Sequence, residues 1–300
     1  MSDRPIELLA AYWTLAGDVW PGAPTEVSPF PFEERTAVAA AAGWTGMGLV
    51  HEDLVATVSR IGYAGIRRVL ADHGIRHVEV EFLSDWFVDP SDPARVASDR
   101  VRAELLEAAG ELGARNLKVS PTLFATDPPD VPRMRDSFAG LCEEATDAGT
   151  NVVMEMMPFT NVNTIERAMA IISGADQPNG GILLDIWHVV RGGIDHEAIL
   201  SIPAGFLMGV ELDDADAAII GTLFDDTRFQ RRLCGDGVFD VPAFLRTVHA
   251  AGFAAPYYGV EIISEAFRRQ PLEVMARTAF ETTMRQVALA EPGSVGGAQP

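Results

Sequence analysis

Four acidic residues each end a short apolar run of the sequence, and a histidine closely follows one of them. Glu155 ends the run NVVME, Asp185 ends GGILLD with His188 three residues later, Glu211 ends MGVE and Glu261 ends YYGVE. Such runs are typical of buried strands in a parallel sheet, where the carboxyl ends of successive strands lie side by side. We therefore expect these side chains to converge on one point and to form a metal site, with Glu155, Asp185, Glu211 and Glu261 as its ligands.

The ligand types indicate which metal the site would hold. Four carboxylates gathered in a pocket of low dielectric without a cation would cost several kcal/mol, or some would have to stay protonated. Oxygen ligands with little imidazole favour Mn²⁺ or Mg²⁺, whereas zinc usually takes more nitrogen or sulfur. Manganese is the first choice, and Mg²⁺, Co²⁺ and Zn²⁺ stay open. Acidic residues at strand ends can also merely cap the next helix, but four equivalent positions favour the metal.

The elements that must position these side chains alternate along the whole chain. Strands are predicted over Glu7–Thr14, Gly46–Val50, Arg76–Phe82, Arg115–Ser120, Asn151–Met157, Gly181–Ile186, Phe206–Leu212 and Tyr257–Ile262. Between them, apolar residues recur at intervals of three and four, which predicts helices, including Asp53–Asp72, Pro93–Leu112, Arg133–Ala148, Thr164–Ser173 and Val241–Ala251. Eight strand and helix repeats predict an α/β fold of one domain, a (β/α)₈ TIM barrel over residues 1–290, with a disordered tail over 291–300. A doubly wound open sheet is the alternative, but no Gly-x-Gly-x-x-Gly follows the first strand.

Two connections are longer than the usual two to six residues. They span residues 17–32 and 213–237, the second with a short helix expected over 222–233. Because both follow strands, both should overhang the carboxyl ends of the barrel, where the predicted ligands lie.

Composition excludes several classes of protein. The 300 residues are 48% apolar and carry a formal net charge of −20, which would repel a nucleic acid. No stretch approaches the roughly 18–20 apolar residues of a membrane span, and the first residues lack the pattern of a secretory signal. We therefore expect a cytoplasmic protein that binds neither nucleic acid nor a membrane. Cys142 and Cys234 have no metal-ligand spacing and are expected to be unpaired thiols.

Other residues near the strand ends are weaker candidates for the site. His51 and Glu81 follow or end early strands and either face the pocket or have a capping or surface role. Lys118 could contact a substrate anion or could pair with a carboxylate. Three tryptophans could form an apolar wall against a sugar, although packing is the commoner role of aromatic residues in barrels: Trp13, Trp86 and Trp187.

The order of these motifs resembles that of the xylose isomerase-like TIM barrels. Glu155, the Asp185-x-x-His188 pair, the sequence GDGVFD over 235–240 and Glu261 carry the resemblance, which extends from Glu7 to about residue 290. That superfamily contains sugar isomerases, ketose 3-epimerases, inosose dehydratase and AP endonucleases. The resemblance implies that Glu155 and Glu261 bind the metal and exchange the substrate proton, and that His188 forms a hydrogen bond with a substrate oxygen.

The chain departs from this pattern at the seventh strand. Most relatives have a histidine ligand where this chain has Glu211, and if Glu211 points away, Asp213 or Asp214 could replace it. The epimerases also carry an arginine after this strand to hold the substrate. The nearest arginines here are Arg228, Arg231 and Arg232.

The first functional hypothesis is a divalent-metal-dependent isomerase or epimerase of a sugar or related polyol ketone, which transfers a proton through a metal-stabilised enediolate. One alternative is a lyase or dehydratase of the same barrel, acting on an inosose or a dehydroshikimate or cleaving a sugar conjugate. Another is a non-catalytic sugar-binding barrel or partner subunit. DNA repair is disfavoured by six histidines and the charge of −20. The expected partner is a small, unphosphorylated carbohydrate or polyol, and a homodimer is left open because such barrels commonly pair.

Overall fold

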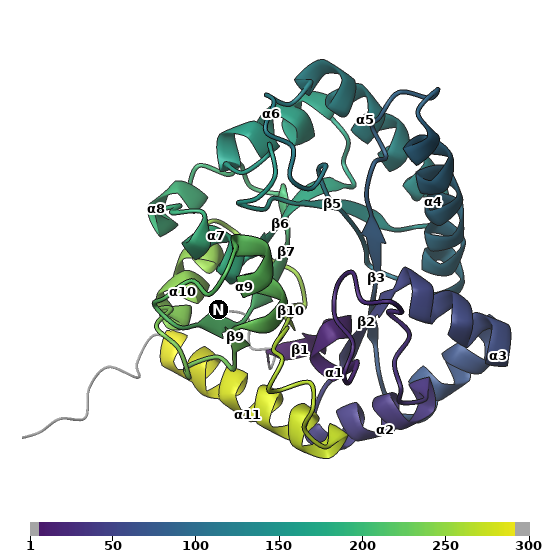
Figure 1. Cartoon of the computed structure of the whole chain (residues 1–300), viewed down its shortest axis with the longest axis vertical. Coiled ribbons are helices and arrows are strands. Elements are labelled where there is room, and N and C mark those ends of the chain that lie inside the picture. The colour runs from purple at the N-terminus through teal and green to yellow at the C-terminus, as the bar shows by residue number, and fades with distance from the viewer. Residues whose placement is uncertain (1–5, 292–300) are drawn as a thin grey trace, which may run out of the picture.

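Eight parallel strands close into a barrel in the computed structural model, which describes residues 6–291 (Figure 1). The order around the barrel is β1-β10-β7-β6-β5-β4-β3-β2. Strands that are neighbours in the barrel therefore follow one another along the chain, except for β1 and β10, whose pairing closes the barrel. The strands are β1 Glu7–Ala10, β2 Gly46–Val50, β3 His77–Leu83, β4 Asn116–Val119, β5 Asn151–Glu155, β6 Gly180–Asp185, β7 Leu207–Leu212 and β10 Tyr257–Val260. The predicted barrel is confirmed.

Helices surround the barrel in Figure 1, and one continuous apolar cluster fills the space between them and the strands. The longer helices are α2 Phe32–Ala42, α3 His51–Asp72, α4 Pro93–Leu112, α5 Val131–Asp147, α6 Ile165–Ala175, α10 Val241–Ala250 and α11 Leu272–Ala290. The shorter ones are α1 Tyr12–Leu15, α7 Ile186–Arg191, α8 His196–Ile199 and α9 Leu223–Phe229. Within the described residues, no helix has the length and apolar character that crossing a membrane requires.

The long connection after β7 contains a small antiparallel pair of strands, β8 Asp214–Ala215 and β9 Arg231–Arg232. The Asp214 carboxylate fixes this loop, because it accepts hydrogen bonds from the backbone N–H groups of Gly235 (3.0 Å), Gly237 (3.0 Å) and Phe239 (2.9 Å). The helix expected over 222–233 is α9, and it ends at Phe229 because β9 follows. The loop therefore holds Arg231 at a defined place beside the barrel.

The first predicted strand was too long. β1 ends at Ala10, and the chain turns into α1 at Tyr12. The Thr14 hydroxyl donates to the carbonyl of Val260 (2.7 Å) and accepts from the N–H of Ile262 (2.9 Å), which ties this turn to the end of β10. Periodicity alone does not separate a short apolar strand from a buried helical turn. The predicted tail over 291–300 lies, from residue 292 onward, outside the described residues.

Polar residues occupy part of the barrel interior. Glu79 on β3 accepts hydrogen bonds from the Asn116 side chain on β4 (2.6 Å) and from the hydroxyl of Tyr257 on β10 (2.7 Å). All three are buried. Buried polar groups are costly unless they are paired, so this network specifies which side chains of the three strands face each other. It lies below the level of the acidic residues at the strand ends.

Candidate metal centre

The barrel brings the four predicted ligands together at the carboxyl ends of its strands. Glu155 is the last residue of β5, Asp185 the last of β6 and Glu261 the first after β10. Glu211 on β7 is the register partner of Asp185. All four are buried, and one oxygen of each lies within 4.8 Å of the others. Convergence at the strand ends is thus a property of this structure, while metal ligation itself stays a prediction.

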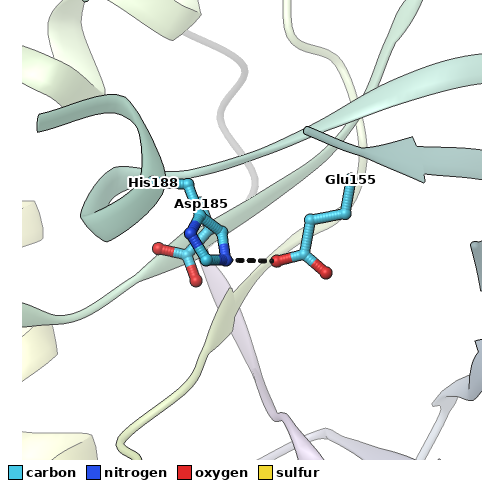
Figure 2. Close-up of side chains that lie close together, drawn as sticks. All are labelled: Glu155, Asp185 and His188. Carbon is cyan, nitrogen blue, oxygen red and sulfur yellow. Dashed lines mark ion pairs between the residues drawn. The ribbon is translucent and has the colours of Figure 1, made fainter. Parts of the chain in front are cut away.

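His188 lies beside this cluster because α7 begins directly after β6. The carboxylate of Asp185 accepts a hydrogen bond from the backbone N–H of Trp187 (2.7 Å) and caps the helix. Its first turn carries His188 back over the strand ends, where Nε2 lies 3.1 Å from Oε1 of Glu155. Figure 2 shows the His188 ring and the Glu155 carboxylate pointing toward each other, with Asp185 beside the ring. Asp185 therefore caps α7 and also lies among the four predicted ligands.

A glycine makes room for the Glu211 side chain. Gly259 on β10 is the register partner of Glu211. A Cβ at Gly259 would lie 2.8 Å from Cγ of Glu211, closer than such atoms pack. The YYGVE run therefore contributes Glu261 and, through Gly259, the space that the Glu211 side chain on β7 requires.

Two fully buried cations contact the acidic residues, one from β4 and one from β9. On β4, the Lys118 ammonium pairs with Glu211 and lies 3.0 Å from Glu81 and 3.6 Å from Glu79. On β9, Arg231 Nη1 lies 2.5 Å from Asp185, 2.5 Å from Asp213 and 3.2 Å from Glu261. The sequence left Lys118 open between a substrate anion and a carboxylate, and the structure shows the carboxylate pairing.

Burial and these charges shift the pKa values of the cluster. Burial lowers the pKa of the Lys118 ammonium, but the charges of Glu211, Glu81 and Glu79 outweigh it and raise that pKa well above its usual range. Burial raises the pKa of Glu211 well above its ordinary value, against the opposing effect of Lys118. Burial also raises the pKa of Glu261 to about 8, although Arg231 and Lys118 oppose the rise. At neutral pH these two carboxyls therefore tend to hold protons when no further cation is present.

Arg231 has the opposite effect on Asp185. Burial raises the pKa of Asp185, but the charges of Arg231 and His188 more than offset this, and its pKa lies below the ordinary value. Asp213 contacts the same guanidinium, yet burial and the charge of Asp185 raise its pKa well above its usual range. Asp185 is thus the member of the cluster that stays ionised most readily beside Arg231.

The residues present suit a divalent cation. Lys118 and Arg231 contact six carboxylates directly, and Glu155 adds a seventh, which leaves five negative charges in excess if all are ionised. Oε2 of Glu211 and Oδ1 of Asp213 are buried without a hydrogen-bond partner among residues 6–291. Buried charges of this kind are normally paired or bound to metal. An all-carboxylate ligand set fits Mn²⁺ or Mg²⁺.

The alternative ligands on this stretch lie outside the converging set. Asp213 pairs with Arg231, and Asp214 accepts the backbone hydrogen bonds of its loop. Glu211 lies within 4.8 Å of the other three predicted ligands, and neither aspartate belongs to that group among the described residues. The geometry therefore favours Glu211 as the oxygen ligand from β7.

A cavity of about 660 Å³ opens above the cluster. Its floor contains Glu155, Glu261 and His188, with Arg231 and Glu81 beside them, whereas Asp185 and Glu211 lie beneath and do not line it. This volume is in the middle of the range of roughly 300–1,000 Å³ for small-molecule sites. A substrate in this cavity would therefore meet two of the four predicted ligands directly.

The lining of the cavity combines charged and aromatic groups. The charged groups include His51, which pairs with Glu104, together with Glu52 and Arg100. The aromatic groups include Phe159 and Phe224, whose ring centroids are 5.5 Å apart. The Phe159 ring also lies edge-on to the His188 ring, at 5.7 Å. These phenylalanines were not singled out from the sequence, because Phe159 lies in a turn after β5 and Phe224 in the short helix α9, where no long periodic pattern marks them.

The remaining candidates divide between the cavity and the core. Trp13, His51, Glu81 and Arg228 line the cavity, as does Thr227, which accepts two hydrogen bonds from Arg231. Trp86 and Trp187 are buried packing residues, Arg232 pairs with Asp216 on the surface, and Cys142 and Cys234 are buried free thiols as expected.

Comparisons with known proteins define the class. Residues 36–285 match the profile of the xylose isomerase-like TIM barrel family, and the chain belongs to that family. It is similar to 3-dehydroshikimate dehydratase of Pseudomonas aeruginosa, with 27% identity over 249 residues, which are 81% of this chain and 38% of that protein. It is also similar to inosose isomerase of Bacillus subtilis, with 26% identity over 155 residues, which are 51% of this chain and 54% of that protein. The chain thus spans well under two thirds of the length of these relatives.

Solved structures share the fold. The IolI protein, crystallised with a bound zinc atom, superposes with a TM-score of 0.80 at 18% identity, covering 94% of this chain and 98% of that one. An L-ribulose 3-epimerase superposes with a TM-score of 0.68 at 17% identity, covering 97% of this chain and 100% of that one. At this identity the likeness concerns the fold alone.

Proposed function

We propose that this protein is a divalent-metal-dependent enzyme that removes a proton from the carbon next to the carbonyl group of a sugar or polyol ketone, and returns it as an isomerase or epimerase. One observation carries the proposal. Of the four converging carboxylates, Glu155 and Glu261 also line the cavity floor, from strands on different sides of the barrel. Two carboxylates that reach both the metal position and the substrate space are what a two-sided proton transfer requires.

The residues of the floor suit proton transfer near neutral pH. Glu261 has a pKa of about 8 in the metal-free protein, raised chiefly by burial, so it can accept and hold a proton there. His188 Nε2 lies 3.1 Å from Glu155, and its Nδ1 has no partner within the described structure. His188 can therefore hold Glu155 in place or donate to a substrate oxygen. A bound divalent ion, for which Mn²⁺ is our choice, would supply Lewis-acid polarisation of the carbonyl group.

A second candidate is a dehydratase that uses the same residues. The similarity to 3-dehydroshikimate dehydratase over 81% of this chain favours it. Proton removal would be the same, and the reaction would then lose a hydroxyl group from the neighbouring position, with His188 as the group placed to protonate it. Arg100 and Arg228 line the cavity and could pair with a substrate carboxylate.

Deuterium exchange tests the proposal and separates the two candidates. The full chain, loaded with Mn²⁺, is incubated in D₂O with ketohexoses, inososes and 3-dehydroshikimate, and followed by NMR. We expect deuterium to enter next to the carbonyl group of at least one compound. An isomeric product supports the first candidate, and loss of water supports the second. Absence of exchange with every compound contradicts both and favours a binding protein.

Matched variants assign the exchange to the cavity. Glu155→Gln and Glu261→Gln should each abolish it. Glu265→Gln is the control, because Glu265 follows the same strand, pairs with Arg269 and is 47% exposed. Its exchange rate should equal that of the unsubstituted chain.

A further inference from the structure

Lys118 crosses the barrel interior to reach a strand that is not its neighbour. It lies on β4, and its ammonium pairs with Glu211 on β7, although β5 and β6 stand between these strands. Both side chains are buried, with 0% and 1% of their surface exposed. Such a contact joins opposite parts of the barrel at the level of the acidic cluster, and solvent does not screen it.

The two oxygens of Glu211 have different surroundings. Oε1 accepts from the Lys118 ammonium. Oε2 is buried without a hydrogen-bond partner in the described part of the chain. Glu211 is also one of the four carboxylates that lie within 4.8 Å of one another. The side chain is therefore held at Oε1, and Oε2 is the unpaired oxygen of a carboxylate that belongs to the converging set.

We propose that Lys118 is the positioning residue of the metal centre, which fixes Glu211 through Oε1 so that Oε2 serves as the ligand oxygen from β7. The inference rests on the metal centre of the proposed function. Partners that orient a metal ligand commonly change metal affinity ten- to a hundredfold when they are removed. Lys118 would act through Glu211 and does not line the cavity, so it need not touch the substrate.

The other acidic partners of Lys118 provide a control. Glu79 lies 3.6 Å from the ammonium, but its Oε1 is occupied by Asn116 and Tyr257, and it is not part of the converging set. Glu79→Gln therefore disturbs the surroundings of Lys118 without touching Glu211. If general loosening of the interior weakened the metal site, Glu79→Gln would weaken it as well.

The test measures binding of Mn²⁺ to the metal-free full chain by the EPR signal of the free ion. We expect Lys118→Met to bind Mn²⁺ ten- to a hundredfold more weakly, and Glu79→Gln to stay within about threefold of the unsubstituted chain. The d–d absorption of bound Co²⁺ gives a second readout, since this spectrum responds to the ligands and the coordination geometry of the bound ion. We expect a changed spectrum for Lys118→Met alone.

Two results would overturn the inference. Equal or tighter Mn²⁺ binding by Lys118→Met would show that the ammonium only neutralises charge. An equal loss in Glu79→Gln would show that the effect is not specific to Glu211. If Lys118→Met does not fold, Lys118→Gln, which keeps a donor but loses the charge and some length, is measured against the same expectations. No Mn²⁺ binding by the unsubstituted chain would instead refute the proposed function.

Discussion

Replacing Glu261 by glutamine should remove a pH-dependent loss of stability from the metal-free protein. Burial raises the pKa of Glu261 from 4.5 to about 8, against the opposing charges of Arg231 and Lys118. Between these pH values the folded chain holds a proton at Glu261 that the unfolded chain has released. Because the folded state binds more protons, its stability falls as the pH rises from about 4.5 to about 8.

The size of this loss follows from the same shift. Each pH unit between the two pKa values corresponds to about 1.4 kcal/mol, so the interval from 4.5 to about 8 amounts to roughly 5 kcal/mol. Glutamine resembles the protonated carboxyl group and does not titrate. Glu261→Gln should therefore match the unsubstituted chain near pH 5 and exceed its free energy of unfolding by up to about 5 kcal/mol near pH 9.

Urea denaturation in the presence of a chelator, followed by circular dichroism from pH 5 to 9, measures this difference. The exposed control Glu265→Gln should run parallel to the unsubstituted chain across the range. When saturating Mn²⁺ replaces the chelator, the loss of stability with rising pH in the unsubstituted chain should become smaller, because a bound cation stabilises the ionised carboxylates. If Glu261→Gln also runs parallel to the unsubstituted chain, Glu261 does not hold a proton in the folded state, and burial does not raise its pKa.

Three further outcomes are expected. In the deuterium-exchange assay, Glu155→Gln abolishes turnover. Elemental analysis of this variant still finds the metal, which is lost only in the double variant that also carries Glu261→Gln. Normal exchange in both single variants would refute the two-glutamate mechanism. Asp214→Ala lowers the free energy of unfolding in urea by roughly 3–5 kcal/mol, because four backbone N–H groups lose their acceptor, and a change below about 1 kcal/mol would contradict this. Phe224→Ala raises KM about three- to tenfold with kcat little changed, since it removes aromatic wall contacts; a fall in kcat alone would speak against this role.

The convergence of the acidic residues could be predicted because a closed barrel constrains it. Each acid ends an apolar strand, and parallel strands end on one face. The order of elements, which the alternation of apolar runs and amphipathic stretches provides, is sufficient to place four acids in one cluster without any knowledge of side-chain conformation: Glu155, Asp185, Glu211 and Glu261.

The partners of these acids could not be predicted in the same way. Whether Lys118 turns toward a substrate or toward Glu211 depends on how far its side chain reaches across the interior, and sequence spacing carries no such information. Arg231 lies in a loop whose path is set by hydrogen bonds to Asp214. Without that loop its pairing with Asp185 and Asp213 could not be distinguished from a role in holding the substrate.

The end of β1 shows a different limit. Tyr12 and Thr14 continue an apolar run and read as strand, but contacts with the end of β10 turn them into α1. Those contacts join residues about 250 positions apart. Local pattern carries no information about them, whereas the helices with clear periodicity, such as α4 and α10, begin at the predicted residues.

Anomalous diffraction at the manganese edge, from crystals grown with Mn²⁺ and without chelator, shows whether the four carboxylates bind a metal ion. We expect one peak at the carboxyl ends of β5, β6, β7 and β10. It should lie at about 2.0–2.3 Å, the bonding distance for carboxylate oxygens on such ions, from one oxygen each of Glu155, Asp185, Glu211 and Glu261. A well-ordered cluster with no peak, its carboxylates paired only with Lys118 and Arg231, would show that these residues do not form a metal site.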